Sequence, residues 1–119
     1  MWEYRCKDAY VAPTNERENA NENVVAYIGN GSDYTLALNA HYDTLPVFLS
    51  EWKTPPFELV HMENRLYGRG TNDDKGAIAT IFSAVEEAKH HPNLELFFTC
   101  DKEAGSKYGM DYVAGEIVV

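Results

Sequence analysis

The chain has 119 residues, of which 45% are hydrophobic and 24% are charged, the balance of one globular domain with a modest core. Its formal net charge of -9 argues against polyanionic partners, so we expect no binding to nucleic acid or to anionic membrane surfaces. No apolar run reaches the roughly 18 residues that a membrane span needs, and residues 1–10 lack the apolar segment of a signal peptide. Without a secretion signal, we expect Cys6 and Cys100 to be reduced thiols of a soluble, cytoplasmic protein.

The first half of the chain predicts a loop followed by two strands. Residues 13–23 are polar and show no periodicity, which is typical of a loop. Residues 23–28 and 34–40 are apolar and rich in strand-forming side chains, and the turn signal at residues 29–32 lies between them. We therefore expect these two strands to pair as a hairpin. Prolines break the stretch that follows, which predicts a long surface loop. They are Pro46, Pro55 and Pro56.

One helix is predicted to begin near Asp74 and to end near His91, because Pro92 cannot continue it. Its apolar side chains recur at helical spacing and form one stripe. They are Ile78, Ile81, Phe82 and Val85. Thr71, Asn72 and Asp73 are all of a type that caps a helix.

The second half of the chain completes an α/β pattern. A short extended piece ends at residue 67, a buried strand is expected over residues 94–99, a short helix over 106–115 and a further strand over 116–119. This order predicts an α/β fold with a mixed, mostly parallel sheet flanked by helices. Functional residues of such sheets collect at the carboxyl ends of the strands.

Three polar clusters lie at positions of this kind, at residues 41–43, 70–75 and 101–103. A neutral histidine such as His41 is a good zinc ligand, and a carboxylate such as Asp43 can hold its ring. Asp73 and Asp74 are also explained by helix capping, although capping does not account for the glycines on both sides of them. Each cluster alone also fits a purely structural role. The order of all three is more specific, and we expect them to converge at one edge of the sheet.

The clusters and the segment between them resemble a known family. The matching residues are 40–46 (AHYDTLP), Trp52 with Pro56 and Phe57, and 66–76 (LYGRGTNDDKG). They are similar to the aminoacylase, succinyl-diaminopimelate desuccinylase and glutamate carboxypeptidase family of di-zinc metallopeptidases. The similarity extends over residues 23–113, and two zinc motifs joined by a tryptophan-containing loop form a specific pattern.

The resemblance implies a role for each matching residue. His41 would bind one metal ion, Asp73 would bridge two ions, and Glu103 would bind the second. Asp43 would orient the His41 ring, and the peptide bond between Asp73 and Asp74 would be cis. The implied reaction is hydrolysis of an amide bond in an N-acyl amino acid or a small peptide by a water activated between two zinc ions. Cobalt or manganese would also suit an oxygen-rich site with one histidine.

Lys102 departs from the family pattern, which places a glutamate there as the general base. An ammonium group carries donors and no acceptor, so it cannot take a proton from water in the ordinary way. We interpret Lys102 as an inactivating substitution, with Asp101 as a stand-in only after a shift of the backbone. The remaining histidines are not expected to be ligands. They are His61, His90 and His91.

The family also has later metal ligands and a lid or dimerisation domain that have no counterpart in this sequence. Residues 1–119 are therefore expected to form a partial catalytic domain that binds zinc weakly and below two equivalents. Three interpretations stay open: a metallohydrolase fragment, a non-catalytic binding protein that keeps the fold, and a fragment with no function of its own. The sequence leaves the particular substrate and the oligomeric state undetermined.

Overall fold

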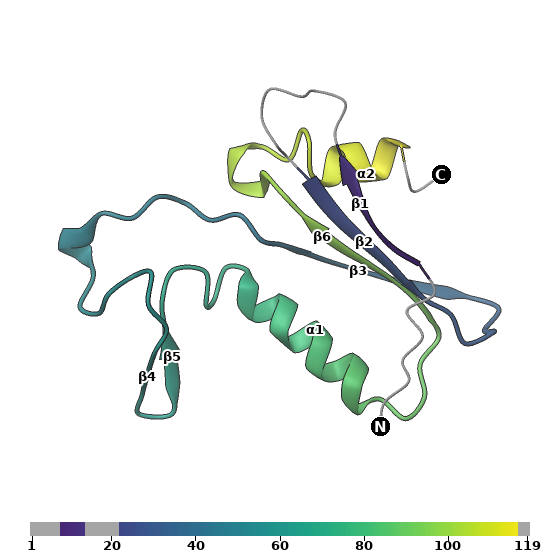
Figure 1. Cartoon of the computed structure of the whole chain (residues 1–119), viewed down its shortest axis with the longest axis horizontal. Helices are drawn as coiled ribbons and strands as arrows, with labels where there is room; N and C mark the ends of the chain where they lie inside the picture. The colour runs from purple at the N-terminus through teal and green to yellow at the C-terminus, as the bar shows by residue number, and fades with distance from the viewer. Residues whose placement is uncertain (1–7, 14–21, 117–119) are drawn as a thin grey trace.

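Four strands form one mixed sheet at the centre of the molecule. The computed structural model describes residues 8–13 and 22–116, and its sheet has the order β1-β2-β6-β3 (Figure 1). The strands are β1 (Asp8–Pro13), β2 (Glu22–Ile28), β3 (Thr35–His41) and β6 (Asn93–Thr99). β3 runs parallel to β6, whereas β1–β2 and β2–β6 are antiparallel. The mixed α/β class is confirmed, but parallel pairing does not predominate among these four strands.

The predicted hairpin of residues 23–28 and 34–40 is wrong, because β6 lies between β2 and β3. β6 is buried along almost its whole length, with Leu94, Leu96, Phe97 and Phe98 all buried, as its central position between two strands requires. The turn between β2 and β3 instead docks onto the start of β6. Asn93 accepts a hydrogen bond from the backbone N–H of Asn30 at 3.0 Å and donates one to the carbonyl of Ser32 at 2.8 Å. The Asn30 side chain also donates to the carbonyl of His91.

Two helices cover opposite faces of the sheet (Figure 1). α1 (Lys75–Glu87) lies over one face, where its residues pack against the buried Leu94, Leu96 and Phe98. α2 (Met110–Glu116) lies over the other face, where Val113 is buried with Val25 and Phe97. Successive side chains of β6 point to opposite faces of the sheet, so Leu96 and Phe98 pack under α1 while Phe97 packs under α2.

The helix boundaries differ in part from those predicted. α1 begins where expected, with Asp74 as its first flanking residue, but ends at Glu87 rather than near His91. Ala88 is already extended, which lets the chain turn back into β6. α2 confirms a short helix in this region, but the helix begins at Met110 rather than at residue 106. It includes Glu116, so the strand expected over 116–119 does not begin there. Residues 117–119 lie outside the described part of the chain.

The predicted long loop follows β3 and contains a small hairpin that projects away from the sheet (Figure 1). The loop has one turn of 3-10 helix, η1 (Leu49–Glu51), before the hairpin of β4 (Val60–Met62) and β5 (Arg65–Tyr67). β5 confirms the short extended piece, while β4 was not expected from sequence. Its turn is made by Glu63 and Asn64, both at positive φ, instead of the more recognisable Asn-Gly pair.

The described N-terminal residues are more extended than the sequence predicted. Pro13 belongs to β1 and residues 22 and 23 belong to β2, so these three residues are strand residues and not part of the loop predicted over residues 13–23. Residues 14–21 and Cys6 lie outside the described part of the chain.

Cys100 is a buried free thiol, and burial raises its pKa above the ordinary value. Neither of the described α-helices is long and apolar enough to cross a membrane.

Candidate metal centre

His41 is the last residue of β3 and lies at the carboxyl end of the parallel β3–β6 pair. Its side chain is only 7% exposed, and both ring nitrogens face carboxylates. Nδ1 lies 3.2 Å from Asp43 Oδ1 and also 3.2 Å from the Asp43 carbonyl, while Nε2 lies 2.8 Å from Asp73 Oδ1. The ring is therefore held on one side by Asp43 and presents its other nitrogen to Asp73.

Asp73 lies in the turn that leads into α1, and its peptide bond to Asp74 is cis, as the family resemblance implied. Its side chain is 56% exposed. The contact with His41 lowers the pKa of Asp73 below its ordinary value, with a smaller contribution from the charge of Lys102. The carboxylate is thus an accessible anion next to a buried imidazole.

Glu103 reaches the same place from a short 3-10 turn, η2 (Lys102–Ala104), which follows β6. The Asp43 carboxylate fixes this turn, because it accepts hydrogen bonds from the backbone N–H groups of Lys102 at 3.2 Å and Glu103 at 2.9 Å. Ligand atoms of His41, Asp73 and Glu103 all lie within 4.8 Å of one another. The expected convergence of the three motifs at one edge of the sheet is confirmed.

Lys102 lies next to this cluster with its ammonium group directed at two of the three members. Its Nζ is 3.3 Å from Glu103 Oε1 and 3.7 Å from Asp73 Oδ1. The hydrogen bond to Glu103 raises the pKa of Lys102 above its ordinary value, and the Asp73 charge adds to this. A lysine that served as a general base would need the opposite shift.

Asp101, the stand-in considered from sequence, has a structural role in this arrangement. One of its carboxylate oxygens accepts a hydrogen bond from the backbone N–H of Tyr108, and the other accepts one from Gly109, at 2.9 and 2.8 Å. Its backbone is left-handed, with φ 49°. These contacts connect the end of β6 to the loop before α2. Both carboxylate oxygens of Asp101 are engaged in them, so the side chain is not directed at the metal cluster.

The donor chemistry of the cluster fits a divalent cation. One imidazole nitrogen and two carboxylates are the ligand types that zinc, cobalt and manganese accept. Among the described residues, His41, Asp73 and Glu103 form the one cluster of this kind, and His61, His90 and His91 lie outside it. The ammonium group of Lys102 competes with a cation for the same two carboxylates.

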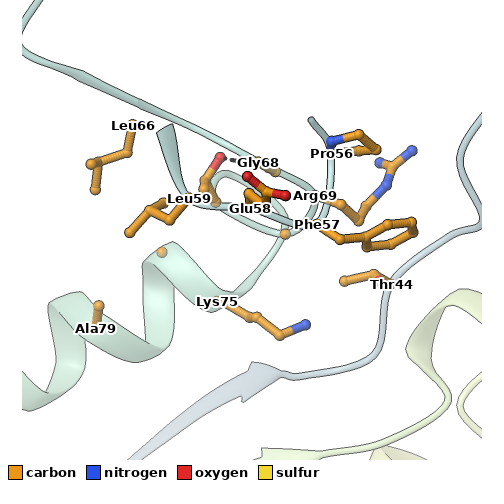
Figure 2. Close-up of a pocket in the computed structure, with 13 residues that line it drawn as sticks. Thr44, Pro56, Phe57, Glu58, Leu59, Leu66, Gly68, Arg69, Lys75 and Ala79 are labelled. Atoms are coloured by element: carbon orange, nitrogen blue, oxygen red, sulfur yellow. Dashed lines mark hydrogen bonds between the residues drawn. The ribbon is translucent and has the colours of Figure 1, made fainter. Parts of the chain in front are cut away.

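Two cavities lie beside the cluster. The larger, about 460 Å³, lies between the β4–β5 hairpin and the start of α1, and Figure 2 shows Leu59, Leu66 and Ala79 along its apolar side. Thr44 and Lys75 border it on the side of β3, but it includes none of the three ligand residues. The smaller cavity, about 290 Å³, is lined partly by Trp52 and Asp73 and is the one that reaches the cluster.

Sequence reasoning missed the contacts of two residues that accompany the cluster. Asp74 accepts a hydrogen bond from the backbone N–H of His41 at 3.2 Å, and Lys75 donates one to the carbonyl of Tyr42 at 2.7 Å. Both residues belong to the same sequence motif as Asp73, so the motif singles them out as candidates. The sequence does not show which backbone group at the end of β3 each side chain contacts.

The layered α/β fold carries an acidic and histidine cluster at the carboxyl end of the parallel β3–β6 pair, the edge where sheets of this class place their functional sites, and the donor set is that of a metal-dependent protein. Residues 37–118 match peptidase family M20/M25/M40, and the chain belongs to this family. The resemblance drawn from the sequence motifs is therefore confirmed.

Individual relatives agree with this assignment. The chain is 39% identical over 99 residues to an uncharacterised metallohydrolase of Methanocaldococcus jannaschii, covering 76% of this chain and 24% of the relative. It is 37% identical over 91 residues to an acetylornithine deacetylase of Vibrio parahaemolyticus, covering 74% and 24%. The crystal structure of an M20 family metallo-carboxypeptidase from Sulfolobus solfataricus superposes with a TM-score of 0.73 at 30% identity, covering 88% and 24%. The chain thus spans about a quarter of the length of these relatives.

Proposed function

We propose that this chain is the metal-binding core of a hydrolase that cleaves an amide bond in an N-acyl amino acid or a small peptide. The observation that carries the proposal is the convergence of His41, Asp73 and Glu103 within 4.8 Å at the carboxyl end of β3 and β6. The substrate class follows from family relatives named as a deacetylase and a carboxypeptidase.

The proposal assigns a task to each side chain of the cluster. His41, Asp73 and Glu103 would hold zinc, with Asp73 shared if two ions bind, as its exposed carboxylate allows. Asp43 would orient the His41 ring through Nδ1, the usual function of a carboxylate behind a metal-bound histidine. Bound zinc would supply Lewis-acid activation of a water and of the scissile carbonyl.

Lys102 would limit turnover in this chain. Its ammonium group lies 3.3 Å from Glu103 and 3.7 Å from Asp73, at the position where the family resemblance implies a proton-accepting glutamate. A positive charge there opposes the entry of a cation and has no lone pair to accept a proton. Removing a general acid–base group alone typically costs about 10²–10⁴-fold in rate.

The second candidate function is a binding protein that keeps the fold without the chemistry. The ion pairs of Lys102 with Asp73 and Glu103 favour it, because they provide the two carboxylates with a counter-charge from within the protein. This candidate predicts that the chain is fully folded without metal and does not hydrolyse any substrate.

Calorimetric titration of the chain with zinc distinguishes these functions. We expect weak binding below two equivalents, loss of binding in His41→Ala, and unchanged binding in His61→Ala, which removes a histidine outside the cluster. Two tight sites, or equal binding by both variants, would show that the assigned ligands are wrong. No binding by the unaltered chain, together with no hydrolysis of N-acyl amino acids or dipeptides, would favour the binding protein.

A further inference from the structure

The turn that carries Asp73 is held against the end of β3 by two contacts that do not involve the proposed ligand side chains. The Asp74 carboxylate accepts a hydrogen bond from the backbone N–H of His41, with an N···O distance of 3.2 Å. The Lys75 ammonium group donates a hydrogen bond to the carbonyl of Tyr42 at 2.7 Å. Two consecutive side chains after Asp73 therefore bind backbone groups of two consecutive residues, the N–H of His41 and the carbonyl of Tyr42, at the end of β3.

The turn of residues 70–75 is closed by its own backbone hydrogen bond, so the contacts of Asp74 and Lys75 with β3 hold the turn as a whole. The backbone N–H of Lys75 donates to the carbonyl of Gly70 at 2.9 Å. Gly70 is buried with φ +88°, and a Cβ atom there would lie 3.2 Å from the Lys75 side chain at Cδ. Lys75 is therefore held at its backbone by Gly70 and at its ammonium group by Tyr42, and it connects the turn to β3.

We propose that Asp74 and Lys75 are positioning residues that hold the Asp73 carboxylate at coordination distance from His41 and thereby strengthen binding of a divalent cation. The inference rests on the proposed function. Two donor atoms on one tetrahedral zinc ion, each about 2.0–2.2 Å from it, lie about 3.3 Å apart. The separation between His41 Nε2 and Asp73 Oδ1 is 2.8 Å, a hydrogen-bond distance, so the two ligand atoms are close to this spacing and need only a small outward shift to hold an ion. A pair that is held in place before the ion arrives loses less conformational freedom on binding.

Asp74 and Lys75 could affect zinc affinity either by positioning Asp73 or through their own charges, and substitutions at the two residues distinguish these explanations. Lys75 is a cation near a cation site, so an effect of charge alone would make its removal strengthen metal binding. Positioning predicts the reverse, a weaker site in Lys75→Met and a site of nearly unchanged strength in Lys75→Arg. An effect of charge alone would weaken Asp74→Asn and Asp74→Ala equally. Positioning predicts that Asp74→Asn keeps its affinity, because its amide oxygen still accepts from the His41 N–H.

Calorimetry with zinc alone on the 119-residue chain and these four variants tests the proposal. We expect Asp74→Ala and Lys75→Met to lose about 10–100-fold in affinity, the usual cost of removing a group that orients a ligand. A Lys75→Met variant that binds zinc as tightly as the unaltered chain would overturn the proposal. An Asp74→Asn variant as weak as Asp74→Ala would also overturn it.

Nitrogen-15 NMR of the His41 ring in the metal-free chain separates this proposal from the proposed function. The contact between His41 and Asp73 exists without an ion, so the Ala and Met variants are expected to shift the ring signals and the Asn and Arg variants to leave them in place. Unmoved signals in all four variants would contradict positioning even if zinc binds. Shifted signals in proteins that bind no zinc would refute the metal site and support positioning. Thermal unfolding identifies any variant that has lost its fold. If Asp74→Ala or Lys75→Met is unfolded, the zinc affinity and ring signals of Asp74→Asn or Lys75→Arg test the proposal at that position.

Discussion

The Asp43 carboxylate contacts two of the three motifs of the site. Oδ1 lies 3.2 Å from the ring nitrogen of His41 and accepts from the backbone N–H of Lys102, while Oδ2 accepts from that of Glu103. A single side chain therefore sets both the tilt of the imidazole and the place of the Glu103 turn. The side chains proposed to touch metal are fixed by neighbours that do not, which is why their geometry depends on residues beyond the ligands.

Lys102→Glu is expected to raise the zinc affinity of the chain about tenfold, because it replaces a cation 3.3 Å from Glu103 by a further anion. Half-exposure of the lysine screens the effect and keeps it modest. Lys89→Glu makes the same change of net charge at an exposed position outside the cluster and serves as the matched control. Calorimetric Kd values that change equally in both variants would mean that Lys102 does not act locally.

The same substitution is expected to restore little hydrolysis of N-acyl amino acids or dipeptides. A carboxylate at position 102 would provide a proton acceptor, but the described residues offer three ligand side chains for the proposed pair of ions. The assay compares the unaltered chain, Lys102→Glu and the double variant Lys102→Glu with His41→Ala, each with added zinc. Turnover that appears in Lys102→Glu and persists without His41 would contradict the assigned site.

At the scale of secondary-structure elements, the entry into α1 depends on a close approach of the backbone at Gly76. A Cβ atom at this position would lie 2.2 Å from the carbonyl oxygen of Thr71, well inside any allowed contact. The turn of residues 70–75 is closed by the hydrogen bond between Lys75 N and the Gly70 carbonyl, so it cannot open without losing that bond. Only glycine fits where the helix begins against this turn.

Gly76→Ala is therefore expected to lower the free energy of unfolding by about 1–3 kcal/mol, the usual cost of forcing an extra methyl group into packed structure. Gly115→Ala is the matched control, because it lies in α2 with no atom within 4 Å of the added Cβ. That variant should be neutral or slightly stabilising, since alanine favours a helix over glycine. Urea denaturation of both variants measures the difference, and equal midpoints would mean that the turn moves aside freely.

On the scale of the whole molecule, stability is concentrated in the two layers against the sheet and not in the loop that projects from it. Phe97 is 2% exposed between the sheet and α2, and Phe98 is 7% exposed on the α1 side. Phe57, near the β4–β5 hairpin, is 76% exposed. The loop is held by fewer contacts, of which the stacking of Arg69 over Trp52 at 5.3 Å is one.

Phe97→Ala is expected to cost about 3–5 kcal/mol of unfolding free energy, whereas Phe57→Ala should stay within about 0.5 kcal/mol. The two substitutions remove the same side chain, so their difference reports burial alone. Urea denaturation followed by circular dichroism provides both values. A large loss in Phe57→Ala would show that the hairpin region belongs to the folded core.

The sequence by itself determined the class of the protein, the strand of residues 94–99, the start of α1 and the identity of His41, Asp73 and Glu103 as residues that meet. The strand and the start of the helix depend on local patterns, whereas the class and the three site residues followed from the resemblance of the ordered motifs to a known family. Only the tertiary structure decided that β6 separates β2 from β3, because strand order depends on competition for the buried centre of the sheet. It alone also placed Asp74 against His41 and Lys75 against Tyr42, contacts between segments 33 residues apart that follow from how the sheet and α1 meet.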